Sequence, residues 1–276
     1  MTVRASPQTL LDVLNHIAAV TEEARLEFEA DAIEVTERDP ANVSMVDLTI
    51  HAELFETYDP VLTEVHIDVP QTISAVSSLK KQEEFIEDPD PLALEYDDET
   101  KKVTLSYGGN SFNLATATVG KTRPKMPEVD YAFSAELDSK WLSYKADICA
   151  DVSEKVGLEA QNRTFSVTAL ADDDGFAATL EEDDLSANAI SDGIADTLVD
   201  TNYLKETLAP ISGNVTLKVG KSKPILIQSE GGNIEFTYVI APRIKADDSS
   251  ASEESESDNE ESATEDSSAA AEASAD

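Results

Sequence analysis

The chain has 276 residues, of which 57 are acidic and 20 are basic, and its formal net charge is −37. This length accommodates about two domains, and such acidity usually repels nucleic acids and membranes. The single cysteine, Cys149, excludes an intrachain disulfide framework. The N-terminus lacks the apolar core of a signal peptide, and no run of 18 apolar residues could span a membrane. We therefore expect a cytoplasmic protein without a membrane partner.

Residues 246–276 differ in composition from the rest of the chain. They include twelve Asp and Glu but no Lys, Arg or aromatic residue, so they lack the apolar surface that offsets the entropy of ordering a chain. We predict that this acidic tail is disordered. Residues 1–245 still carry 45 acidic and 20 basic side chains. That excess suits molar salt, where the Debye length falls to roughly 3 Å and self-repulsion is screened; an acidic protein from a low-salt cell is the alternative.

In the first half of the chain, predicted strands separate two predicted helices. Ser6 followed by Pro7 is typical of a helix start. The apolar face of this helix comprises Leu10, Leu14, Ile17 and Ala18. Apolar and polar side chains alternate at 43–50, 65–69 and 103–107, which predicts strands that each expose one face to solvent. A second helix is expected from about residue 70, with an apolar face of Ile73, Val76 and Leu79.

The second half of the chain repeats this alternation. A third helix is predicted after Asp138 and Ser139, and its apolar face comprises Trp141, Tyr144, Ile148, Cys149, Val152 and Val156. A strand is predicted at 165–169. A fourth helix is expected after Asp200 and Thr201, with an apolar face of Leu204, Leu208 and Ile211. A last strand is predicted at 236–240. Because Cys149 lies on a helical apolar face, we interpret it as a core residue.

Two kinds of repeat predict a duplicated domain. The four helix starts recur at intervals of about 60–70 residues. Residues 92–96 resemble residues 215–219, and the Gly-Gly-Asn segment after Tyr107 resembles the one after Glu230, with both pairs 123 residues apart. Gly-Gly-Asn suits a tight hairpin turn that needs positive φ.

A segment between the two repeats breaks both periodicities. Residues 117–130 contain Gly120, Pro124 and Pro127, which is typical of an extended connector. We therefore expect an N-terminal domain at 1–116, a connector at 117–130, a C-terminal domain at 131–245 and the tail at 246–276.

Four segments carry a likeness to known proteins. They are DPANVSMVDLTI at 39–50, the Met126-Pro-Glu step, the helix and strand segment at 203–224, and YVIAPRI at 238–244. Together they resemble the proliferating cell nuclear antigen (PCNA) family of DNA polymerase sliding clamps. The likeness extends over 1–245 and is strongest in 39–50 and 200–244. Combined with the acidity, it suggests a halophilic archaeon, or a virus of one, as the source.

The resemblance implies an α+β DNA clamp fold in which each of two domains contains two βαβββ units. Three chains would form a head-to-tail ring, a homotrimer, with the helices lining the hole. By analogy, residues 111–118 would pair with residues 175–180 of a neighbouring chain. The expected interface residues are Phe112, Leu114, Phe176 and Ala178. An ordinary core position is the alternative for Phe112.

The resemblance also implies a function without catalysis or a cofactor. The ring would encircle double-stranded DNA without reading its sequence, and would bind DNA polymerase, the clamp loader and other proteins that carry clamp-binding peptides. Candidates for facing the DNA are Lys80, Lys81, Lys140, Lys145 and Lys205, although each could be a solvated helix residue. The partner-peptide pocket would comprise Met45, Met126, Pro224, Val239, Ala241 and Pro242, edged by Arg38 and Asp39. Val239 departs from the aromatic residue that many family members have, and core packing is the alternative for Met45.

Other functions have weaker support in the sequence. His16, His51 and His66 are isolated, and the acids at 172–174 before Gly175 fit a hairpin turn better than a calcium loop, because residue 170 is Leu where an acid is needed. No phosphate loop, zinc ligand set or nucleophile elbow argues for an enzyme. A checkpoint-type or virus-specific clamp with another ring assembly remains an alternative, as does an acidic module that binds proteins but not DNA. The tail suits solubility, repulsion of acidic competitors, or binding to basic partner segments.

Overall fold

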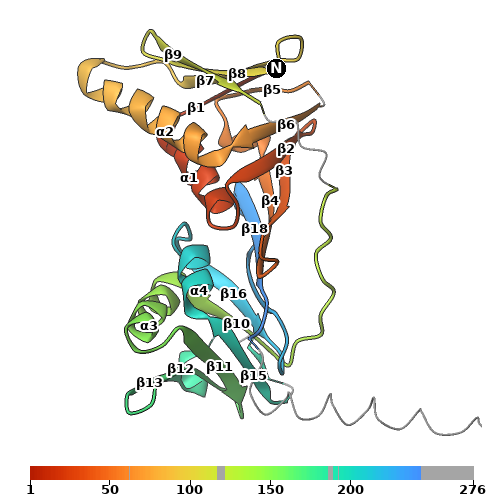
Figure 1. The fold of residues 1–276 in the computed structure, drawn as a ribbon, viewed down its shortest axis with the longest axis vertical. Helices are drawn as coiled ribbons and strands as arrows, with labels where there is room; N and C mark the ends of the chain where they lie inside the picture. The colour runs from red at the N-terminus through yellow and green to blue at the C-terminus, as the bar shows by residue number, and fades with distance from the viewer. Residues whose placement is uncertain (62, 117–121, 186–188, 192, 244–276) are drawn as a thin grey trace, which may run out of the picture. The chain divides into compact units, whose positions relative to one another are not determined.

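The computed structural model describes residues 1–61, 63–116, 122–185, 189–191 and 193–243, and within them one order of elements occurs twice (Figure 1). The first lobe runs from β1 to β9 and the second from β10 to β18. In each lobe, a strand, a helix and five strands precede a second helix and three further strands. The predicted acidic tail lies outside the described residues. The domain limits remain a prediction, because residues 1–243 form one compact unit.

The described chain contains four α-helices, and each begins where the sequence predicted. They are α1 (Pro7–Ala18), α2 (Val69–Lys80), α3 (Ser139–Val152) and α4 (Thr201–Leu208). The Ser6 hydroxyl accepts a hydrogen bond from the amide of Thr9 at 3.0 Å, and the carboxylates of Asp68, Asp138 and Asp200 cap the other three helices in the same way. Such caps satisfy amides that lack an intrahelical partner. Short 3-10 turns occur at η1 (Ala52–Leu54), η2 (Lys81–Phe85) and η3 (Glu182–Asp184).

The described strands form three antiparallel sheets. The first has the order β5 (Thr57–Asp59), β1 (Thr2–Ala5), β7 (Leu92–Asp97), β8 (Lys102–Tyr107), β9 (Asn110–Ala115). The second has the order β14 (Ile190–Ser191), β10 (Phe133–Asp138), β16 (Asn214–Val219), β17 (Ile225–Ser229), β18 (Ile234–Ile240), β4 (Ser44–His51), β3 (Ala32–Arg38), β2 (Glu23–Phe28), β6 (Thr63–Asp68). The third has the order β13 (Gly175–Leu180), β12 (Thr164–Leu170), β11 (Lys155–Gln161), β15 (Ala195–Asp200).

The second of these sheets continues from one lobe into the other. The last strand, β18, pairs with β4 of the first lobe from Ile234 opposite Ile50 to Ile240 opposite Ser44. Phe236 and Tyr238, which face the core, are buried there. In Figure 1 the four helices lie on the same side of this sheet. Backbone hydrogen bonds and apolar burial together therefore join the lobes.

The structure corrects parts of the predicted helix faces. The face predicted for the third helix ends at Val152, because Val156 belongs to β11 and is buried there. Tyr144 does not lie in the core and is 60% exposed. Ile211 follows the end of α4, and Ala18 is exposed. A helical spacing shows which residues share a face, but tertiary packing decides how wide the buried stripe is.

Two turns follow the sequence prediction. Gly108 and Gly109 have φ of 56° and 78° and join β8 to β9, as a two-residue hairpin with positive φ requires. Residues 172–174 lie in the connection between β12 and β13, which are hydrogen-bonded neighbours. The acidic triplet is therefore a hairpin turn.

Candidate functional surfaces

Five of the six predicted pocket residues lie at one end of three adjoining strands. Met45 of β4 is the cross-strand partner of Val239 of β18. Ala241 and Pro242 follow β18, and Pro224 precedes β17, whose first residue pairs with the last residue of β18. Val239 is buried, whereas the other four are half-buried and so partly accessible. Met126 lies in the connector and is half-buried.

The Asp39 carboxylate shapes the loop that leads into β4. It accepts hydrogen bonds from the amides of Ala41, Val43 and Ser44 at 3.0, 2.6 and 2.7 Å, so the loop turns back sharply through Asn42, which has φ of 60°. An Asx-type turn of this kind explains why Asp and Asn occupy these two positions. The first signature segment of the sequence thus sets where β4, and with it Met45, begins.

A hollow of about 460 Å³ lies between this loop and the connector. Its described lining includes Glu37, Arg38, Asp39, Thr122 and Pro124. Arg38 and Asp39, which were predicted to edge the partner pocket, line this hollow, but none of the six predicted pocket residues is part of it.

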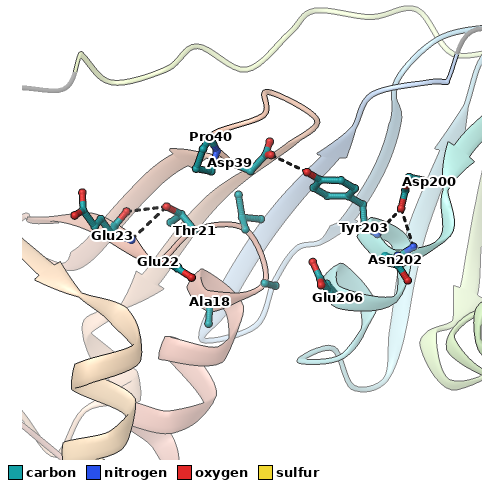
Figure 2. Close-up of a pocket in the computed structure, with 12 residues that line it drawn as sticks. Ala18, Thr21, Glu22, Glu23, Asp39, Pro40, Asp200, Asn202, Tyr203 and Glu206 are labelled. Atoms are coloured by element: carbon teal, nitrogen blue, oxygen red, sulfur yellow. Dashed lines mark hydrogen bonds between the residues drawn. The ribbon is translucent and has the colours of Figure 1, made fainter. Parts of the chain in front are cut away.

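A larger hollow, of about 740 Å³, lies where the two lobes meet (Figure 2). It is lined by the end of α1, by Asp39 and Pro40, and by the start of α4. Tyr203 of α4 donates its hydroxyl proton to the Asp39 carboxylate at 3.0 Å. The pKa of Tyr203 is raised mainly by burial and, to a smaller extent, by this carboxylate. The described lining contains five acidic side chains and no basic one, which disfavours DNA as its ligand.

The connector is attached to the first lobe through Arg123. Its guanidinium lies 3.1 Å from Glu27 of β2, 3.1 Å from Glu34 of β3 and 3.8 Å from Asp47 of β4. Its Nε also donates to the Thr36 hydroxyl at 2.9 Å. No local sequence pattern marks this cluster, because its members are up to 96 residues apart.

The predicted DNA-facing lysines differ in their surroundings. Lys80 donates to Gln8, and Lys205 pairs with Asp147 at 3.0 Å. The Lys145 ammonium lies over two rings, 4.9 Å from the centroid of Tyr144 and 5.7 Å from that of Trp141. Lys81 and Lys140 are exposed. All five lysines lie on, or directly after, the helices on one side of the nine-stranded sheet. The charge of Lys205 is partly neutralised by Asp147.

The predicted interface residues lie on two edge strands. Phe112 and Leu114 are in β9, and Phe176 and Ala178 are in β13. Within the described residues, each strand is hydrogen-bonded to one neighbouring strand only. Phe112 is 40% exposed, so the alternative of an ordinary core position is wrong for the isolated chain. The other three are half-buried.

His16 was judged isolated from the sequence, yet it contacts the far end of the chain. Tyr238 donates its proton to the His16 carbonyl at 3.0 Å, so the imidazole donates through Nδ1 to the Tyr238 oxygen at 2.8 Å. Burial lowers the pKa of His16 to about 4. The two side chains are 222 residues apart, and no local pattern could have paired them.

The remaining candidates for chemistry give no site. Cys149 is fully buried, as predicted, and burial raises the pKa of its thiol to about 11. The described residues contain no group of His, Cys, Asp and Glu side chains that could hold a metal. None of the helices in that part of the chain is both long and apolar enough to cross a membrane.

Comparison with known proteins links this geometry to a family. No family model matches the chain. The DNA polymerase sliding clamp of Haloarcula marismortui is 27% identical over 252 residues, which cover 88% of this chain and 98% of that protein. That of Methanoculleus marisnigri is 28% identical over 242 residues, covering 85% and 94%. Over most of its length, the chain is similar to DNA polymerase sliding clamps of archaea.

A solved structure agrees with the fold described above. The PCNA of A. fulgidus, bound to the C-terminal region of FEN-1, matches with a TM-score of 0.78 and 23% identity over 89% of this chain and 99% of that one. The expected clamp fold, with antiparallel sheets and few helices, is therefore confirmed.

Proposed function

We propose that this clamp forms a homotrimeric ring around duplex DNA and tethers DNA polymerase, the clamp loader and other replication and repair proteins to it. It acts without catalysis of its own, in the cytoplasm, as a processivity factor. The full-length similarity to sliding clamps carries this proposal.

The repeated order of elements supports a ring made from one kind of chain. By position in the two lobes, β13 is equivalent to β4, and β9 is equivalent to β18. The pair β4 and β18 joins the lobes inside the chain, whereas β13 and β9 are both open edges. Pairing β9 of one chain with β13 of the next repeats the internal joint between chains and removes exposed edges.

The helices support a passage for DNA that needs no tight contact. The five lysines lie on or directly after these helices, and weak phosphate contacts from such residues allow sliding. A closed ring holds the duplex by topology, which reconciles a net charge of −37 with DNA binding.

The experiment measures primer extension by the cognate polymerase in molar KCl. Full-length clamp, loaded on nicked circular DNA, is expected to lengthen products many-fold, and cutting the circle is expected to release the clamp. Equal product lengths with and without the clamp would overturn the proposed function.

We also propose that the clamp-binding peptide enters the region of Met45, Met126, Pro224, Val239, Ala241 and Pro242. The A. fulgidus PCNA structure, which holds the C-terminal region of FEN-1, supports this choice of ligand. Met126→Glu is expected to abolish polymerase stimulation while the mass of the ring stays the same, because a carboxylate at this position disfavours an apolar anchor. Stimulation equal to that of the wild type would show that Met126 lies outside the pocket.

A further inference from the structure

Three adjacent strands of the first lobe bring three carboxylates together, and the Arg123 guanidinium of the connector lies among them. Glu27, Glu34 and Asp47 come from three neighbouring strands. Three carboxylates at this spacing repel one another unless a cation lies between them. Glu27 shares its second oxygen with Arg25 at 3.0 Å, and both of these side chains are largely buried. The site is therefore built to hold a guanidinium in one place.

The residues beside Arg123 lack comparable contacts. Lys125 and Glu128 are exposed and make no hydrogen bond or ion pair with the described residues. From Thr122 to Tyr131 the chain contains neither helix nor strand. Arg123 is thus the polar attachment of the described connector to the first lobe.

The attachment lies directly at the smaller hollow. Thr122 and Pro124, on either side of Arg123, form one wall, and Glu37, Arg38 and Asp39 form the other. A shift of Arg123 would move the first wall relative to the second. Three residues further on is Met126, the connector residue of the proposed peptide pocket.

We propose that Arg123 is a positioning residue for partner binding: its ion pairs with β2, β3 and β4 hold the connector in the conformation that receives the partner peptide. The proposal rests on the proposed partner site. A segment held in its bound conformation loses less entropy when a ligand binds, so the attachment raises affinity without touching the peptide.

The test measures binding of a fluorescent peptide that carries a glutamine, an aliphatic residue and paired aromatics to the full-length clamp. Arg123→Ala is expected to weaken binding about tenfold, or about 1.4 kcal/mol. Arg123→Lys is expected to restore part of the loss, because lysine keeps the charge but not the forked geometry. Lys125→Ala, the matched control, is expected to stay within about twofold of wild type.

Two further measurements separate positioning from general stability. A lysine-specific protease is expected to cut after Lys125 several-fold faster in Arg123→Ala than in the wild type, with ring mass and thermal unfolding unchanged. Glu34→Gln is expected to weaken peptide binding alone, but to add little to Arg123→Ala, because the two changes break one interaction.

The outcomes distinguish the proposed role of Arg123 from the proposed partner-peptide site on which it rests. If wild-type clamp fails to bind the peptide, the partner site itself is wrong. If wild type binds and Arg123→Ala binds equally well, with equal cleavage after Lys125, the partner site stands and the role of Arg123 is overturned.

Discussion

Phe236 and Phe112 lie in the last strands of the two lobes but differ in exposure. Each follows a Gly-Gly-Asn segment and lies in the last strand of its lobe. Phe236 lies opposite Leu48 of β4 and is 7% exposed. Among the described strands, β9 with Phe112 has a neighbour on one side only, and Phe112 is 40% exposed. The comparison indicates that β4 and β18 form a closed strand pair, or joint, inside the chain, whereas the corresponding strands β13 and β9 are edge strands in the described sheets.

The largest expected difference concerns the free energy of unfolding of the monomer. Phe236→Ala is expected to remove about 3–5 kcal/mol, because it leaves a cavity in a packed core. Phe112→Ala is expected to change the same quantity by less than about 1 kcal/mol. Denaturant unfolding, at concentrations low enough for any ring to dissociate, measures both. Equal losses would contradict the contrast between a closed joint and an open one.

Acid is expected to weaken the internal joint next. The native His16 imidazole stays neutral down to a pKa of about 4, whereas the unfolded chain takes up a proton near 6.5. Stability present above pH 6.5 is therefore lost as the pH falls toward 4, by roughly 3 kcal/mol.

Unfolding measured between pH 7 and pH 4 tests this loss, with His66→Gln as a control that keeps it. His16→Gln is expected to lose most of the dependence. A pH profile of His16→Gln that matches the wild type would assign the effect to other groups.

A smaller effect is expected at the larger hollow. Tyr203→Phe removes the hydrogen bond between α4 and the Asp39 carboxylate, and it is expected to cost about 1–2 kcal/mol. Asp39 keeps its three backbone donors, so the loop before β4 should remain in place. An unchanged free energy of unfolding would mean that this bond adds nothing to the joint.

The elements predicted from sequence are those whose causes are local. Ser6, Asp68, Asp138 and Asp200 cap helices within three residues of themselves, and alternation of apolar side chains marks a strand wherever one face is buried. Gly108 and Gly109 likewise predict a turn from a local cause, because glycine readily adopts the positive φ that the hairpin needs.

What the sequence could not predict depends on distant partners. His16 with Tyr238, Tyr203 with Asp39, and Arg123 with three strands each join segments that are far apart in the chain. Tyr144 was assigned to the core because spacing fixes the face of a helix but not what covers it. The predicted pocket was located by resemblance; five of its six residues lie at the ends of β4, β17 and β18, and Met126 lies in the connector.

The mass of the full-length chain in molar KCl, measured by light scattering, tests the open joint most directly. The account predicts three times the chain mass of 29.8 kDa for the wild type, and one chain mass for Phe112→Asp with its fold intact. A wild-type monomer, or a Phe112→Asp variant that remains trimeric, would contradict the assembly of this clamp through β9 and β13.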